Sequence, residues 1–124
     1  MTRLEFENLV LDMYSVKADY PFEDDFETGV FRHTGTGKWF AIAMNVKASK
    51  LGKSEGENID IVNLKCAPEV IETLVLEEAG IYPAYHMNKE HWSTVIVGGD
   101  AEHRQIMEMI AESYELTAKK GKRK

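Results

Sequence analysis

The sequence predicts an α+β fold: a single two-layer domain with a mainly antiparallel sheet and helices packed on it. The apolar patterns follow the order helix, three strands, helix, two strands, helix. Short turns join neighbouring strand patterns, which favours antiparallel pairing because parallel strands need long crossovers. A length of 124 residues supports one hydrophobic core. We assign residues 1–118 to this domain and expect residues 119–124 to be a disordered basic tail.

The first helix is predicted from Thr2 to Ser15. Thr2 and Glu5 have the spacing of a capping box, in which each side chain binds a free backbone N–H of the other residue. Apolar residues then recur at steps of one, three and four residues, which gives the helix one buried face: Phe6, Leu9, Val10, Met13 and Tyr14.

The next segment predicts a β-hairpin followed by a third strand. Strands over residues 30–34 and 38–46 flank Gly35-Thr36-Gly37, whose glycines tolerate a positive φ. Alternation places Phe40, Ile42, Met44 and Val46 on one face of the second strand. Residues 47–57 are predicted to form a polar loop. In the strand over residues 58–64 the apolar phase changes between Ile61 and Val62, which indicates either a bulge or a different strand boundary.

The remaining elements are two helices with two strands between them. Pro68 suits the first turn of a helix that runs to Ala79 and stops at Gly80. Strands are predicted over residues 83–87 and 92–97. Asp100 is placed to cap a last helix, whose buried face consists of Ile106, Met109, Ile110, Ser113 and Tyr114.

The charge of the chain is divided unevenly along its length. The formal net charge is −6, but five of the cations lie in residues 119–124, so residues 1–118 carry ten cations and 21 acids. This acidic body disfavours a general attraction to phosphate backbones. No long apolar run or signal-peptide pattern is present and Cys66 is the only cysteine, so we expect a cytoplasmic protein without a membrane segment or disulfide.

One stretch resembles a known family over nearly the whole chain. The pattern His86-Met87-Asn88-Lys89 followed by His91-Trp92-Ser93-Thr94-Val95 is similar to the signature of the MmcQ/YjbR family. Pro83 and Tyr85, with Asn88 and Trp92, belong to this structural signature, and Tyr20-Pro21-Phe22, Gly37-Lys38-Trp39-Phe40-Ala41 and Leu64-Lys65-Cys66-Ala67-Pro68-Glu69 match in the expected order. The resemblance implies a YjbR-like, double-wing DNA-binding-like domain. It implies no catalytic residues and no cofactor.

The segment from His86 to His91 is the first candidate site. A turn centred between Asn88 and Lys89 places His86 opposite His91, with Cβ atoms about 5 Å apart, and Tyr85 opposite Trp92. The functional reading is a polar patch of His86, Lys89 and His91 that contacts an anion or a metal. The alternative is a purely structural hairpin. Two histidines without a third ligand make a poor metal site, so we predict no metal.

Lysines in a segment without acids form the second candidate site. Residues 30–53 contain no Asp or Glu, and Lys47, Lys50 and Lys53 lie at the expected loop tip. Such a wing can lie along a DNA backbone, each contact adding salt-sensitive affinity. The alternative is a solvated surface loop, since Glu55 and Glu57 adjoin the lysines.

Three other motifs have structural explanations that we prefer. Cys66, just before a helix, is more simply a small buried residue than a nucleophile. The acids Glu23, Asp24, Asp25 and Glu27 lack the spacing of a calcium loop. Gly35-Thr36-Gly37-Lys38 is not a phosphate loop, because Trp39 replaces the hydroxyl residue and a strand follows.

Three function hypotheses follow, in order of preference. The first is a non-enzymatic domain that binds double-stranded DNA through Lys47, Lys50, Lys53, Lys89, His86 and His91. The second is a protein-interaction or adaptor module that binds another protein or itself, which predicts an exposed apolar patch. The third is an enzyme or ligand-binding protein centred on the two histidines, which predicts a pocket with both on its wall.

Overall fold

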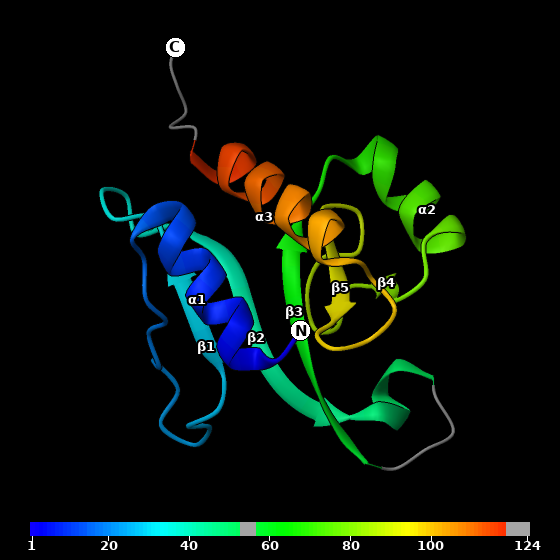
Figure 1. Cartoon of the computed structure of the whole chain (residues 1–124), viewed down its shortest axis with the longest axis horizontal. Helices are drawn as coiled ribbons and strands as arrows, with labels where there is room; N and C mark the ends of the chain where they lie inside the picture. The colour runs from blue at the N-terminus through cyan, green and yellow to red at the C-terminus, as the bar shows by residue number, and fades with distance from the viewer. Residues whose placement is uncertain (53–56, 119–124) are drawn as a thin grey trace.

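The computed structural model describes residues 1–52 and 57–118, and these form three helices and a five-stranded sheet (Figure 1). The predicted order of elements is confirmed, with one added 3-10 helix, η1. The elements are α1 (Arg3–Tyr14), β1 (Gly29–Arg32), β2 (Trp39–Lys47), η1 (Ala48–Leu51), β3 (Asn58–Lys65), α2 (Pro68–Glu77), β4 (Ile81–Pro83), β5 (Trp92–Ile96) and α3 (His103–Ala118).

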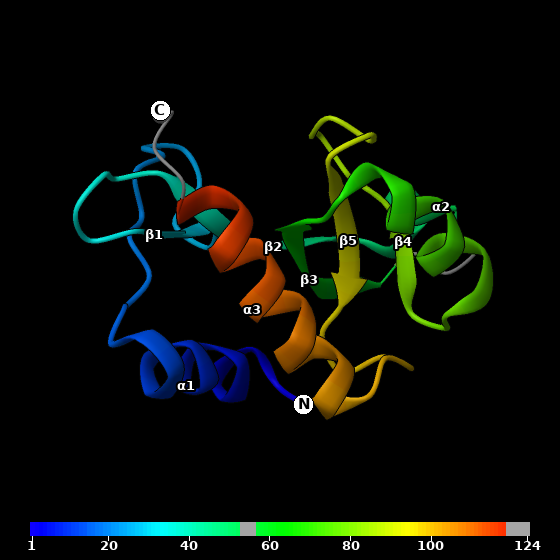
Figure 2. The ribbon, with the colours of Figure 1, turned by 90° about the horizontal axis from the view of Figure 1, so that it is seen from above.

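The sheet has the strand order β1-β2-β3-β5-β4, and every neighbouring pair is antiparallel. Figure 2 shows α1 and α3 on the same side of the sheet, where they form the second layer. The helix α2 packs beside β4 and β5 at one end of this arrangement. The predicted α+β class and two-layer architecture are therefore confirmed.

The helix α1 begins and ends at local signals. The Thr2 side chain accepts a hydrogen bond from the Glu5 N–H at 3.0 Å, and the Glu5 carboxylate accepts one from the Thr2 N–H at 2.8 Å. The capping box is thus present, so the helix begins at Arg3. It ends where Ser15 turns to φ 60° and its N–H bonds the Leu11 carbonyl at 2.8 Å.

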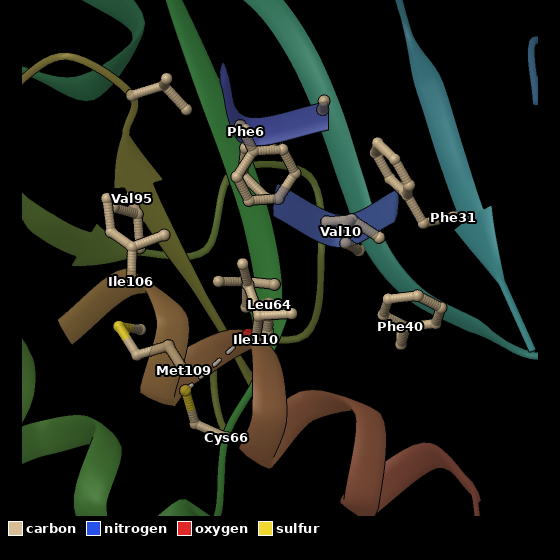
Figure 3. Close-up of a cluster of buried hydrophobic side chains, with 14 of the residues drawn as sticks. Phe6, Val10, Phe31, Phe40, Leu64, Cys66, Val95, Ile106, Met109 and Ile110 are labelled. Carbon is tan, nitrogen blue, oxygen red and sulfur yellow. Dashed lines mark hydrogen bonds between the residues drawn. The ribbon is translucent and has the colours of Figure 1, made fainter. Parts of the chain in front are cut away.

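The core lies between the sheet and the two helices α1 and α3 (Figure 3). Phe6 and Phe31 meet edge to face with ring centroids 5.6 Å apart, a favoured geometry for two aromatic rings. The fully buried large residues of this layer also include Val10, Phe40, Val62, Leu64, Val95, Ile106 and Ile110.

The prediction that Phe40 lies on the same face of β2 as Ile42 is wrong. The register between β1 and β2 shifts between Phe31 and Arg32, because Phe31 pairs with Ala41 while Arg32 pairs with Trp39. The additional residue Phe40 therefore joins Ala41 and Ala43 in the helix-covered core, whereas Ile42 does not belong to it. A bulge shifts the alternation by one residue, which a strict period of two cannot predict.

The bulge predicted within β3 is absent. Residues 58–64 pair without interruption with β2, and residues 61–65 pair without interruption with β5. Ile61 and Val62 are both buried, although alternation sends them to opposite faces. Residues 61–64 are all buried, so the strand is covered on both faces, which explains why the apolar residues Ile61 and Val62 are adjacent.

A buried serine attaches α3 to the sheet. The Ser113 hydroxyl donates to the Phe40 carbonyl on β2 and accepts a 2.9 Å hydrogen bond from the Lys65 N–H on β3. Ser113 had been predicted as part of the buried face, and it is fully buried there. The Ser113 hydroxyl therefore satisfies two backbone groups that the strand ladders leave unpaired.

The predicted end of α2 is two residues too late. The helix ends at Glu77 with Glu78 as its C-cap, and Gly80 follows at φ +84°. The proline at its first turn is confirmed. Residues 119–124, predicted to be a disordered tail, lie outside the described residues.

Candidate nucleic-acid interface

The segment that carries the family-like signature is a loop rather than a hairpin. The strand β4 ends at Pro83, which pairs with Ser93, and residues 84–91 form the connection to β5. The predicted pairings of His86 with His91 and of Tyr85 with Trp92 are therefore wrong. The ladder stops because the Tyr85 N–H bonds the Thr94 hydroxyl at 2.8 Å and the Trp92 N–H bonds the Asn88 carbonyl at 3.0 Å.

Two buried polar side chains hold this loop on the sheet. Asn63 of β3 is fully buried and donates through its amide to the Tyr85 carbonyl at 2.9 Å. The Thr94 hydroxyl, also fully buried, donates to the side-chain oxygen of Asn63 and accepts from the Tyr85 N–H. Both backbone groups of Tyr85 thus form hydrogen bonds with side chains of the sheet, which fixes the beginning of the loop.

The rest of the loop is ordered by its own residues. The Lys89 ammonium donates to the Ala84 carbonyl at 2.8 Å, which closes a ring across the loop. The Asn88 side chain accepts from the Glu90 N–H at 2.8 Å, as asparagines do in tight turns. Asn88 and Tyr85 therefore shape the loop, as expected of signature residues.

His86 is held in an unusual backbone conformation on the exposed side of the loop. Its φ is 61°, in the left-handed region that residues other than glycine seldom occupy. Its ring lies against that of Tyr85 with centroids 4.0 Å apart. The residue is exposed to solvent.

A pocket of about 330 Å³ lies between η1, β4 and this loop. Two lysines and a histidine line it: Lys50 from η1, and His86 and Lys89 from the loop. No acid lines it. We call this the basic pocket, and its lining is Lys50, Leu51, Tyr82, Pro83, Ala84, Tyr85, His86 and Lys89.

The structure therefore places three of the six predicted contact residues, Lys50, His86 and Lys89, around one pocket. Lys47 ends β2 and is exposed near Lys50, but it does not line the basic pocket. His91 is half-buried outside the pocket, and its carbonyl accepts the Cys66 N–H at 2.8 Å. Lys53 lies outside the described residues. The histidine pair that the enzyme hypothesis required is not formed.

Cys66 is a buried structural residue, as predicted. Only 1% of its surface is exposed, and its sulfur lies 3.2 Å from the Ser93 hydroxyl oxygen. Burial raises the pKa of the Cys66 thiol, with a smaller opposing effect from the Ser93 hydroxyl. A thiol that is buried and protonated is a poor nucleophile.

The acidic segment before β1 stabilises its own turn. The Asp25 carboxylate accepts from the Thr28 hydroxyl and from the N–H groups of Glu27 and Thr28, and the hydroxyl contact contributes most to lowering the pKa of Asp25. Among the described residues, no three His, Cys, Asp or Glu side chains converge on a point suited to a metal ion. Within the same residues, no helix is long and apolar enough to cross a membrane.

Sequence reasoning missed Asn63 and Thr94, which hold the loop, and Leu51 and Tyr82, which line the pocket. The sequence does contain a signal for Asn63, because this polar residue lies between the apolar residues Val62 and Leu64. It belongs to a part of β3 in which every residue from 61 to 64 is buried. A polar residue at such a position needs a specific partner.

Comparison with known proteins shows the family and the fold. The YjbR family model matches residues 11–116. The uncharacterized protein YyaQ of Bacillus subtilis is 38% identical over 117 residues, which cover 94% of this chain and 98% of YyaQ. The uncharacterized protein YjbR of Escherichia coli K12 is 39% identical over 61 residues, which cover 49% of this chain and 52% of that protein.

Solved structures agree with the architecture described above. A crystal structure of a protein from Pseudomonas syringae superposes with a TM-score of 0.92 at 39% identity, over 94% of this chain and 99% of that one. The Deinococcus radiodurans protein DR2400 superposes with a TM-score of 0.73 at 27% identity, over 99% of this chain and 83% of that one.

Proposed function

This chain belongs to the YjbR family, and from that premise we propose that it binds double-stranded DNA through the basic pocket, with Lys47 beside it. One observation carries the proposal. Lys50, His86 and Lys89 come from segments far apart in the sequence, yet they line one pocket to which residues 1–52 and 57–118 contribute no acid. In a chain whose first 118 residues carry 21 acids and ten cations, this local segregation favours a site for an anion.

The side chains of the pocket have the chemistry that a phosphate backbone requires. A lysine ammonium has three N–H donors, and Lys89 uses one of them on the Ala84 carbonyl. Its other donors are available for a phosphate oxygen. Lys50 is exposed on η1, and His86 is exposed on the loop. Such contacts position a protein on DNA without reading its sequence.

Acids elsewhere on the surface limit the contact to a small area. Two or three phosphate contacts predict weak binding, in which log K falls against log salt concentration with a slope of about −2 to −3. The proposal implies a cytoplasmic location in a bacterial cell, because duplex DNA is found there.

Fluorescence anisotropy of a labelled duplex, titrated with the full chain over a salt series, tests this proposal. The variant Lys50→Gln is expected to weaken binding and to reduce the salt slope by about 1. Lys17→Gln is the matched control, because Lys17 is equally exposed but lies outside the basic pocket. A second variant with the five cations of residues 119–124 changed to glutamine separates the tail from the pocket.

Each outcome decides between the alternatives. Binding that survives the tail variant and weakens in Lys50→Gln alone supports the proposal. Binding that disappears with the tail cations, or that weakens equally in the two single lysine variants, would show non-specific attraction instead. No binding at low salt excludes the proposal.

A second candidate function, a non-enzymatic protein-interaction module, is favoured by a separate observation. An apolar groove runs between α2 and β4, and it shares only Pro83 and Lys89 with the basic pocket.

A further inference from the structure

The larger groove lies between α2, β4 and the loop 84–91, and has a volume of about 700 Å³. We call it the α2 groove. Its lining combines five apolar residues with three charged ones: Pro68, Ile71, Val75, Leu76 and Pro83, together with Glu72, Lys89 and Glu90. This mixture of an apolar floor and a charged rim is typical of surfaces that bind another protein.

The helix α2 gives the groove an exposed apolar side chain. Leu76 lines the groove and has 78% of its surface exposed. Ile71 of the same helix also lines the groove but packs into the core. The packing of α2 on the sheet uses Ile71 and leaves Leu76 in solvent.

The charged residues of α2 are all acidic. The helix and its C-cap contain Glu69, Glu72, Glu77 and Glu78 and no basic residue. Throughout residues 1–52 and 57–118, none of these carboxylates forms an ion pair. Glu77 and Glu78 also lie at the C-terminal end of the helix, where a carboxylate is unfavourable next to the free carbonyl groups.

Glu69 lies in the first turn, where a carboxylate is favourable, but Glu77 and Glu78 are not explained by the stability of the helix. Two acids line the groove, Glu72 from α2 and Glu90 from the loop. Among the described residues, Lys89 is the single cation of the groove lining, and its ammonium already donates to the Ala84 carbonyl. The rim of the groove thus attracts positive charge from outside.

We propose that the α2 groove docks a basic amphipathic helix of another protein. Its large apolar side chains contact Ile71, Val75 and Leu76. Its lysine or arginine side chains pair with Glu72 and Glu90, the two acids of the groove lining. The ten residues of α2 are about 15 Å long, which matches anchors at positions i, i+3 or i+4, and i+7 of a partner helix.

Two other occupants are disfavoured by the same residues. A peptide strand added to the sheet would have only the three residues of β4 to pair with, and Pro83 among them has no N–H to donate. A second copy of this chain would bring a second α2 with the same acids, so like charges would oppose a symmetric contact.

The probe for this proposal is a labelled synthetic helix, about four turns long, made of leucine and lysine in an amphipathic pattern. Its binding to the full chain is measured by anisotropy, next to a leucine–glutamate peptide of identical pattern and a scrambled leucine–lysine peptide. We expect the amphipathic basic peptide to bind and the other two to bind at least about tenfold more weakly.

Matched variants of the protein locate the contact. Leu76→Ser is expected to weaken the basic peptide by about fivefold or more, because Leu76 is a central apolar anchor. Leu4→Ser is the control, since Leu4 is a similarly exposed leucine, 64% exposed, on α1. Glu72→Gln is expected to weaken binding at low salt, whereas Glu23→Gln, on the distant acidic turn, is not.

Three results would overturn the proposal. One is equal binding of the acidic and basic peptides, and another is equal loss in Leu76→Ser and Leu4→Ser. The third is sedimentation that shows a dimer of the full chain which Leu76→Ser dissociates, since a second copy would then occupy the groove. None of these readouts depends on DNA binding, so this inference and the proposed function fail separately.

Discussion

The amide nitrogen of Asn63 lies 2.9 Å from the backbone carbonyl oxygen of Tyr85, and this hydrogen bond joins the central strand β3 to the loop 84–91. The loop carries His86 and Lys89, two of the side chains that line the basic pocket. A fully buried asparagine thus determines where an exposed charged surface lies. The position of the pocket depends on satisfying polar groups inside the protein.

Replacing Asn63 by alanine is expected to destabilise the protein and loosen the loop. The Tyr85 carbonyl and the Thr94 hydroxyl would each lose a partner, at a cost of about 1–3 kcal/mol for each buried group left unpaired. Urea unfolding measures the loss, and amide exchange at Tyr85 measures the loosening. Asn45→Ala is the control, because half-buried Asn45 bonds the Asp60 side chain, and this variant is expected to cost within about 1 kcal/mol. Equal losses in the two variants would contradict the role of Asn63.

Gly80 is expected to resist substitution, whereas Gly35 is not. Gly80 has φ +84°, and a Cβ there would lie 2.7 Å from the backbone nitrogen of Ala101. Gly80→Ala is therefore expected to lower the free energy of unfolding by more than about 1 kcal/mol. At Gly35 a Cβ meets no atom within 4 Å, so Gly35→Ala is expected to change it by less than about 0.5 kcal/mol. Urea denaturation of the two variants checks the contrast, and a neutral Gly80→Ala would contradict it.

The stability of the fold is expected to fall in mild acid because of His33. This buried ring packs against Tyr114 and bonds the Thr117 hydroxyl at 2.8 Å. Burial lowers the pKa of His33, so the unfolded chain takes up its proton first as the pH falls. The contribution of His33 is complete above about pH 6.5 and is lost as the pH falls from there through the lower folded-state pKa.

Urea unfolding across this pH range tests the role of His33. The variant His33→Gln is expected to depend less on pH than the parent protein. His103→Gln is the control, because His103 is exposed at the start of α3, and its pH dependence is expected to match that of the parent. A parent-like pH dependence of His33→Gln would contradict the prediction.

The single thiol is expected to react slowly in the native protein. Cys66 is buried, and burial raises the pKa of its thiol, so little reactive thiolate reaches solvent at neutral pH. An aromatic disulfide reagent added with and without urea measures the rate, which is expected to rise steeply as the protein unfolds. Rapid labelling without urea at neutral pH would instead indicate an accessible, reactive cysteine.

The elements whose signals are local were predictable from the sequence. The capping box of Thr2 and Glu5 defines the start of α1 within its own first turn. Pro68 marks the start of α2, and Gly35-Thr36-Gly37 separates β1 from β2, as predicted. The burial of Cys66 also followed from its residue type. These features depend on neighbouring residues along the chain, so periodicity and turn chemistry were sufficient to find them.

The features that misled prediction depend on contacts between distant segments. The bulge at Phe40 arises where β2 adapts to β1. The adjacent apolar residues Ile61 and Val62 of β3 resulted from burial on both faces rather than from a second bulge. The hairpin predicted at His86 failed because Asn63 and Thr94, from two other positions in the sheet, bind the backbone of Tyr85.

The sequence by itself determined the fold class, the order of elements and the family resemblance, because each rests on patterns read along the chain. Only the tertiary structure decided that Lys50 approaches His86 and Lys89 while His91 does not. It also decided that α2 leaves a groove lined by Leu76 and Glu72. A pocket or groove is formed by segments that meet only after folding, and their meeting is governed by the packing and hydrogen bonding of buried groups.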